Sequence, residues 1–143
     1  MLPEILKIEN RIPNQYEPIR NCRFRVEFSE DFKMEDWLVD SLTLPKFIKK
    51  SDGYFNHCKI FMSFINLIGP SSSQKFFHNF ILDRKNSFGC KIFLLDPTGI
   101  DISLWELKID SVDSVDFGKL DYNDHSINKI EIMLNVEEAI LVY

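Results

Sequence analysis

The sequence has little of the material from which catalytic and cofactor-binding sites are built. Its 143 residues include five glycines and three histidines, and no GxSxG, Walker-type or GxGxxG pattern occurs. His57, His78 and His125 stand far apart, without an HxH or HExxH motif that would indicate a metal centre. His57 and Cys58 are neighbours in a predicted strand, where adjacent side chains point to opposite faces, so they cannot form a nucleophile–base pair. We therefore expect a chain that is not an enzyme and has no cofactor or metal.

Cysteines and long apolar runs are also scarce. Cys22, Cys58 and Cys90 are odd in number, widely spaced and without a CxxC pair, which is typical of reduced thiols made in a reducing cytosol. The first 15 residues contain no signal-peptide core, and no apolar run approaches the roughly 20 residues of a membrane-spanning helix. We expect a protein that is made in the cytoplasm and has no membrane partner.

Clustered basic charge is absent as well. The 17 lysines and arginines and 22 acidic residues are interspersed and give a formal net charge of −5. A surface that grips nucleic acid needs clustered basic residues, so specific binding of DNA or RNA is not expected. The densest charged feature is a group of aspartates whose spacing matches no EF-hand loop, and a solvated loop face is favoured over a Ca²⁺ site or a catalytic carboxylate pair. Its members are Asp110, Asp113, Asp116, Asp121 and Asp124.

Phenylalanine is what the sequence has in excess, with thirteen copies. Such an excess indicates either a thick core or additional apolar area for contacts between subunits. The codon bias of an A·T-rich genome explains the excess equally well. The length fits a single domain.

Alternating apolar residues predict a chain made mainly of β-strands. A turn at Asp96–Gly99 is expected to join two of the strands, and a change of apolar parity near Trp105 indicates a bulge. Lys46–Asn56 is expected to be a turn-rich loop, with residues 49–53 at its tip. The predicted strands cover residues 22–28, 37–44, 57–66, 91–95, 100–109, 112–117, 128–136 and 139–143.

One helix is predicted, at about residues 72–84. Ser71 and Gln74 have the spacing of a capping box. A stripe of apolar residues at helical spacing is expected to face the core; it consists of Phe76, Phe77, Phe80 and Ile81. Residues 1–20 contain three prolines and are expected to form an N-terminal arm, followed by a single domain over residues 21–143. The predicted fold class is mainly β, an antiparallel two-sheet β-barrel or sandwich with one flanking helix.

Several phrases resemble the tail-tube proteins of T-even-like contractile phages over roughly residues 20–143. The most specific is Ser114–Tyr122, with the sequence SVDFGKLDY. The turn at Leu95–Gly99, Trp105–Leu107, the ending Ala139–Tyr143 and the opening strands at 24–28 and 37–45 fit the same pattern. The chain departs from it at Glu138, where the family often has Asp, and in a Lys46–Asn56 segment that is shorter than the stacking loop of several members.

The resemblance implies a structural virion protein. It implies a β-barrel subunit that forms hexameric rings, stacked into a tube inside a contractile sheath, through which phage DNA passes during ejection without specific binding. Sheath and baseplate proteins are the implied partners, and the virion tail is the implied location. A net negative subunit would repel DNA phosphates, although plain solubility explains the same charge.

The resemblance also implies where copies of the chain meet. The N-terminal arm and the Lys46–Phe55 segment are the predicted interface, and their candidate residues are Leu2, Ile5, Leu6, Ile8, Lys46, Phe47, Lys49, Lys50, Asp52, Tyr54 and Phe55. For Lys49 and Lys50 a solvated tip and a salt bridge to the next ring stay open. Asp116–Tyr122 is expected to be a structural turn in which Tyr122 covers the core.

Three other functions stay open. A baseplate protein that initiates the tube, and the tube of a type VI secretion or extracellular contractile injection system, would share the fold. A monomeric carbohydrate- or peptide-binding barrel is the alternative from a different class, and it would show an aromatic patch without self-assembly. An enzyme would need a constellation of side chains that the sequence does not offer.

Overall fold

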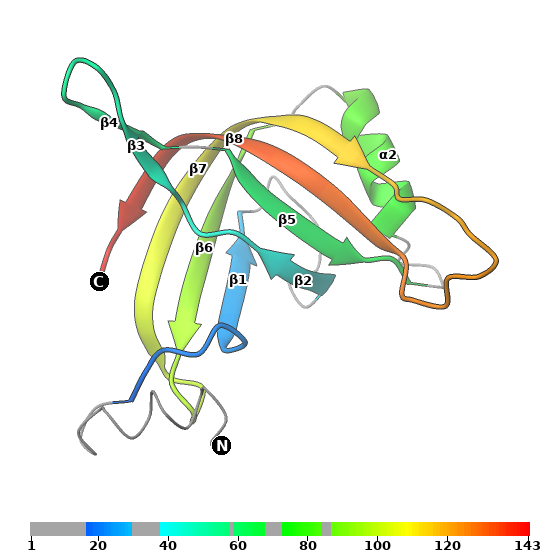
Figure 1. Cartoon of the computed structure of the whole chain (residues 1–143), viewed down its shortest axis with the longest axis horizontal. Helices are drawn as coiled ribbons and strands as arrows, with labels where there is room; N and C mark the ends of the chain where they lie inside the picture. Colours follow the sequence, from blue (N-terminus) through cyan, green and yellow to red (C-terminus); the bar gives the residue numbers. More distant parts are fainter. Residues whose placement is uncertain (1–16, 30–37, 58, 68–72, 84–86) are drawn as a thin grey trace, which may run out of the picture.

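In a computed structural model, the chain folds around one strongly curved antiparallel sheet with a helix against it (Figure 1). The structure describes residues 17–29, 38–57, 59–67, 73–83 and 87–143, so residues 1–16 of the predicted arm, Trp37 and Ser71 lie outside the described residues. The elements are β1 (Phe24–Phe28), β2 (Val39–Leu42), β3 (Phe47–Lys49), β4 (Phe55–His57), β5 (Ile60–Ile65), α2 (Ser73–Asp83), β6 (Phe88–Leu95), β7 (Asp101–Asp116) and β8 (Lys129–Leu141).

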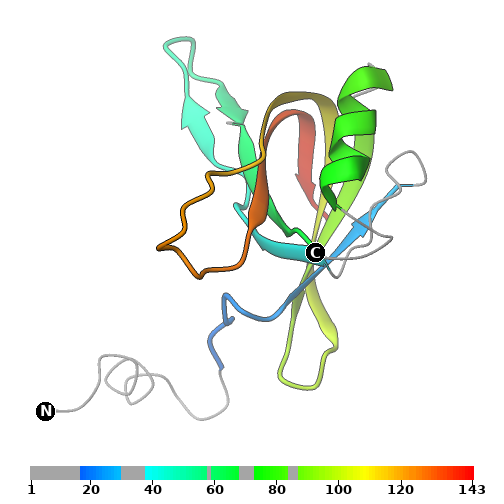
Figure 2. The same cartoon turned by 90° about the vertical axis from the view of Figure 1, so that its right-hand side faces the viewer.

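Six strands form the main sheet in the order β1-β6-β7-β8-β5-β2, and β3 and β4 pair in a separate two-stranded sheet. All pairings are antiparallel. The main sheet curls until it is nearly closed, with the core inside the curl (Figure 2). The mainly β fold class and the flanking helix are therefore confirmed.

The core follows from the period of two along the strands. Ile60, Met62 and Phe64 of β5 are fully buried, and they pair with the equally buried Leu134, Ile132 and Ile130 of β8. Helix α2 adds Phe77, whose ring centroid lies 5.0 Å from that of Phe64. Alternating residues on the other face of the strands remain in contact with water or polar neighbours, as a half-buried sheet requires.

The helix begins beside the end of β5. The side-chain oxygen of Asn66 accepts a hydrogen bond from the backbone N–H of Gln74 at 3.4 Å, which satisfies one donor of the first turn. Phe77 is buried and Phe76 and Phe80 pack against the core, as the predicted stripe requires. Ile81 was also assigned to this stripe and is 43% exposed, so its assignment was wrong.

Strands β7 and β8 are longer than the sequence predicts. Residues 100–109 and 112–117 were expected to form two strands, and so were 128–136 and 139–143, but each pair is one continuous element. Register shifts between Lys108 and Ser114 explain the difference. Because of these shifts, Ile109, Val112 and Val115 all face the core, although they are three residues apart and a regular strand would place them on alternate faces. The bulges bend the strands instead of ending them.

The bulge that was expected near Trp105 lies farther along β7, between Lys108 and Ser114. The apolar residues on both faces of the strand at Trp105 have another cause. Ile92 pairs with Trp105 on the core side, and Phe93 pairs with Leu104 on the opposite face. Both Phe93 and Leu104 are buried there, and the Arg25 guanidinium lies 4.3 Å from the centroid of the Phe93 ring. The sheet is thus covered on both faces at this place, and no parity change is needed at Trp105.

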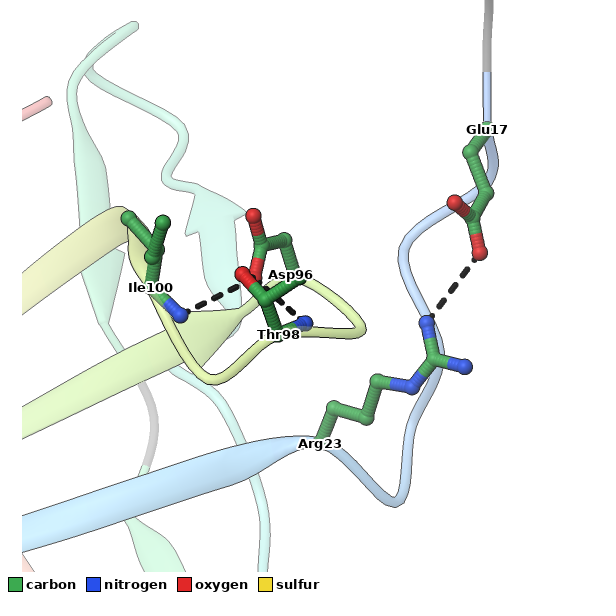
Figure 3. Close-up of polar contacts among 5 residues, drawn as sticks. All are labelled: Glu17, Arg23, Asp96, Thr98 and Ile100. Atoms are coloured by element: carbon green, nitrogen blue, oxygen red, sulfur yellow. Dashed lines mark hydrogen bonds and ion pairs between the residues drawn. The ribbon is translucent and has the colours of Figure 1, made fainter.

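The predicted turn after β6 is confirmed and is held by one side chain. The Asp96 carboxylate accepts hydrogen bonds from the Thr98 hydroxyl at 2.7 Å, the Thr98 N–H at 2.8 Å and the Ile100 N–H at 2.9 Å (Figure 3). Gly99 completes the turn with a φ of 86°, a conformation that glycine adopts without a steric cost. The bonds to Thr98 and Ile100 lower the pKa of Asp96.

Candidate assembly surfaces

The segment between β2 and β5 is a protruding β-hairpin, which we call the hairpin (residues 46–57). The sequence predicted a turn-rich loop here, and that prediction was wrong for its flanks, because Phe47, Ile48 and Lys49 pair with His57, Asn56 and Phe55. The tip is a tight turn in which the Lys50 N–H donates to the Tyr54 carbonyl at 2.7 Å. Gly53 occupies the position with a φ of 91°. The hairpin extends away from the barrel as an ordered ribbon (Figure 1).

Large apolar side chains of the hairpin are exposed to solvent. Tyr54 is 76% and Phe55 62% exposed, and Ile48 is about half exposed. Phe47 stacks on Trp105 of β7 with the ring centroids 6.3 Å apart, which ties the base of the hairpin to the barrel. An ordered ribbon with exposed aromatic residues is typical of a surface that becomes buried in an assembly.

The candidate interface residues therefore divide into two groups. Lys46, Phe47, Lys49, Lys50, Asp52, Tyr54 and Phe55 all lie on the hairpin, which brings them together on one projection. Leu2, Ile5, Leu6 and Ile8 lie outside the described residues. The interface role of both groups stays a prediction.

A second protrusion was not anticipated from the sequence. Residues 116–128, which we call the acidic loop, join β7 to β8 and project at the end of the molecule opposite the hairpin (Figure 1). Tyr122 was expected to cover the core, but its side chain is fully exposed and Leu120 is 90% exposed. The reason lies at the start of the loop, where the Asp116 carboxylate accepts the Gly118 N–H at 2.8 Å and Gly118, with a φ of 91°, turns the chain outward.

The aspartates of the acidic group serve separate purposes. Asp113 forms an ion pair with Lys59 at 2.8 Å, and the hydrogen bond and charge of Lys59 lower the pKa of its carboxyl group. Asp124 accepts hydrogen bonds from the hydroxyl group and N–H of Ser126, which lower its pKa. Asp121 accepts the Asn123 N–H. In the part of the chain that the structure describes, no group of three or more His, Cys, Asp or Glu could hold a metal ion.

The buried thiol of Cys90 is not activated. Cys90 lies in the core, and burial raises the pKa of its thiol to about 12. A thiol with so high a pKa holds almost no thiolate near neutral pH, and the thiolate is the nucleophilic form. Within the described ranges, no helix is long and apolar enough to cross a membrane.

Comparison with known proteins gives an answer at the level of the fold. No protein-family model matches the sequence, and no curated protein matches it. Solved structures do match, each over nearly the whole of both chains. A chain in the cryo-EM structure of the sheath/tube terminator of PVC, an extracellular contractile injection system, superposes with a TM-score of 0.65 and 15% identity over 90% of this chain and 99% of that one.

Two further structures give the same result. A chain in the anti-feeding prophage cap, which terminates its tube, matches with a TM-score of 0.64 and 17% identity, covering 91% of this chain and 93% of that one. A chain in the anti-feeding prophage baseplate matches with a TM-score of 0.60 and 13% identity, covering 89% and 97%. This chain has the fold of contractile injection system components. At the level of the fold, the matches therefore support a likeness to contractile injection systems and not specifically to T-even-like phages.

The sequence contained a signal for the hairpin that was given too little weight. Asp52-Gly53 is a strong turn dipeptide, and it lies between segments rich in apolar residues, a pattern that favours a β-hairpin over a loop. For the exposed Tyr122 the sequence offers no comparable signal, because an aromatic residue in a turn is compatible with both a buried and an exposed position.

Proposed function

We propose that this chain is a structural subunit of the tube of a contractile tail or injection system. In this proposal, six copies form a ring and the rings stack into a tube within a sheath, with the hairpin and the N-terminal arm in the contacts between subunits. The observation that carries the proposal is the likeness in fold to chains of tube-terminator, cap and baseplate structures over nearly the full length of both partners.

The exposed surface supports the same proposal. Seventeen large apolar side chains in the described ranges are exposed, and eleven of them lie on the hairpin, on the acidic loop or in the last four residues, 140–143. Ordered protrusions that carry several exposed apolar side chains are typical of a surface that copies of the same subunit cover in an assembly. This distribution argues against a monomeric binding module, which would concentrate its aromatic residues in one concave patch.

For a phage tail, the material that passes through the tube is DNA. The formal net charge of −5 favours passage without adhesion, because phosphates and a negative wall repel each other. The second candidate function is that of a subunit at one end of the tube, which initiates the tube at the baseplate or terminates it at the cap. It is favoured by the baseplate, cap and terminator structures among the matches, and it predicts few copies per particle.

Electron microscopy of the purified protein tests the proposal. Negatively stained samples over a series of concentrations at neutral pH are expected to show rings or tubes with a central channel and six-fold averages. Sedimentation of the same samples gives the mass of the smallest ring. A single species with the mass of one chain, at every concentration and also after addition of tubes or baseplates from the same particle, would contradict the proposal.

A truncation tests the predicted role of the arm. Deleting residues 2–12 is expected to prevent tube growth while leaving a folded, β-rich domain, as judged by circular dichroism and cooperative unfolding. If the deletion unfolds the domain, the arm belongs to the core of its own subunit and the arm part of the interface is wrong.

A further inference from the structure

The acidic loop presents apolar side chains that the barrel does not use. Leu120, Tyr122 and Ile127 are all exposed, two of them almost completely, although the loop also carries three aspartates and a lysine. Exposed Leu and Tyr side chains contribute little to the stability of a monomer, because burial is what makes them favourable. Their exposure on one short loop indicates a contact with another molecule.

The loop is ordered before any such contact is made. Its turns are closed by the carboxylates of Asp116, Asp121 and Asp124, and the Asp124 N–H donates to the Asp121 carbonyl at 3.0 Å. At its end, Asn128 accepts a hydrogen bond from the Asn66 side chain at 3.0 Å, which ties the loop to the end of β5. A surface that is already ordered loses little conformational entropy on association.

The hairpin is complementary to the acidic loop in charge. Hairpin residues 46–57 contain three lysines and one aspartate, a net of two positive charges, and residues 116–128 contain three aspartates and one lysine, a net of two negative charges. None of Lys46, Lys49 and Lys50 forms an ion pair with another described residue. Both segments expose large apolar side chains between these charges.

The two segments are also placed for contact between copies rather than within one. They lie at opposite ends of the longest axis of the molecule (Figure 1), and both protrude on the same flank when the molecule is viewed along that axis (Figure 2). A second copy displaced along this axis brings its hairpin toward the acidic loop of the first. A contact between two different surfaces of identical chains is heterologous, and it repeats from copy to copy until the assembly closes or ends.

We propose that the hairpin of one copy docks on the acidic loop of the next copy along the tube. The aromatic residues Tyr54 and Phe55 of the hairpin pack against Leu120 and Tyr122 of the loop, and the lysines face the aspartates at the rim. This inference rests on the proposed tube function and adds to it the partner surface that receives the hairpin.

Photo-crosslinking tests the contact directly. The full-length chain with Tyr122→p-benzoylphenylalanine is made in ¹⁵N-labelled and unlabelled forms, mixed at the highest soluble concentration and irradiated. Mass spectrometry is expected to find peptides that join position 122 of one copy to residues 46–57 of a copy with the other label. Crosslinks to any other segment, or no crosslink between copies, overturn the inference. The variant Leu82→p-benzoylphenylalanine, at an exposed position of α2, is the control and should not reach the hairpin of another copy.

Assembly of variants measures the strength of the contact. Tyr122→Ala and Leu120→Ala are each expected to raise the lowest concentration at which tubes form by about tenfold or more, as truncation of a buried interface anchor does. Leu82→Ala, which removes an exposed leucine from α2, is the matched control and should leave this concentration unchanged. An equal response of the loop variants and the control overturns the inference.

Removing charge without disturbing the turns tests the electrostatic part. The double variant Asp121→Asn and Asp124→Asn keeps the side-chain oxygens that accept the turn hydrogen bonds and removes two negative charges. Its assembly concentration is expected to rise about two- to fivefold, as for exposed ion pairs, and to respond less to added salt than that of the unaltered chain. An unaltered salt response overturns the assigned charge contact.

A failure of the docking inference can be distinguished from a failure of the proposed tube function. If tubes form but position 122 crosslinks to another segment, the docking inference is wrong and the proposed tube function is unaffected. A chain that stays monomeric and forms no crosslink between copies would contradict both.

Discussion

The interior of the barrel and the two protrusions are built from the same kinds of apolar side chain, yet they use them differently. In the interior, Phe64 is fully buried between Phe28 of β1 and Phe77 of α2, with ring centroids 6.0 and 5.0 Å away. On the hairpin, Phe55 is 62% exposed. Burial in the barrel thus supplies most of the free energy of folding. The apolar side chains on the two protrusions contribute little to it, because they stay exposed.

The difference separates folding from assembly. A change in the barrel interior alters the stability of the chain, whether or not copies associate. A change to an exposed apolar side chain on a protrusion leaves the folded domain intact and alters association. The first of the three measurements below tests this separation and carries the largest expected effect, and the other two probe the turns at which the chain reverses.

Truncating one phenylalanine in each region gives the largest contrast. Phe64→Ala is expected to lower the free energy of unfolding by about 3–5 kcal/mol, because it leaves a cavity among fully buried side chains. Phe55→Ala is expected to change it by less than about 0.5 kcal/mol, because the ring is mostly in water already. Urea unfolding under conditions where the chain is monomeric measures both values. Equal losses would show that the hairpin belongs to the folding unit of the barrel.

Two glycines with the same backbone conformation sharpen the comparison between the protrusions. Both Gly53 and Gly118 have a φ of 91°, so alanine is strained at either position. A Cβ at Gly53 would meet nothing within 4 Å, whereas at Gly118 it would lie 3.3 Å from the Asn128 side-chain nitrogen and 3.4 Å from the Lys129 carbonyl oxygen.

We therefore expect Gly118→Ala to cost about 2 kcal/mol of stability and Gly53→Ala about 1 kcal/mol. Thermal unfolding of the two variants beside the unaltered chain provides the measurement. A larger loss for Gly53→Ala would mean that the tip of the hairpin is more constrained than the base of the acidic loop.

The smallest expected effect is the pH dependence of the turn after β6. Hydrogen bonds, first of all from the Thr98 side chain, lower the pKa of Asp96 in the folded chain. The group therefore contributes stability that is present above the pKa of about 3.9 of an unfolded aspartate and is lost as the pH falls through its lower folded value. Asp96→Asn keeps the accepting oxygen and removes the titration, so its stability should fall less steeply with acid. Identical acid profiles for both chains would contradict this assignment.

Sequence patterns predicted those parts of the fold where one physical rule decides the outcome. The alternation in β1, β5 and β8 predicted these segments as strands, and their core residues follow that alternation; Phe77 was assigned correctly from helical spacing. The turn at Asp96–Gly99 follows from the conformational preferences of Pro97 and Gly99. Each of these depends on neighbours in the sequence.

The parts that were missed depend on contacts distant in the sequence. The continuity of β7 through its irregularities requires β8 on one side, since the partner strand supplies the hydrogen bonds that keep a bulged strand extended. Tyr122 points into water because the turn at Gly118 directs the loop away from the barrel, and its local sequence fits a buried position equally well. The hairpin residues were named as interface candidates without their strand pairing, and their interface role stays a prediction.

The lengths of β7 and β8 have a mechanical consequence. Both strands run from the base of the acidic loop: β8 is bonded to β5 next to the loop, through residues 129–134, and β7 is bonded to β6 farther away, through residues 101–109. A pull on the loop along these strands acts parallel to the sheet and slides β7 against β6 and β8 against β5. Many backbone hydrogen bonds, which lie across the direction of such a load, then resist together instead of opening one after another. The strand pair that holds the loop is loaded in shear, the direction in which a sheet yields least readily.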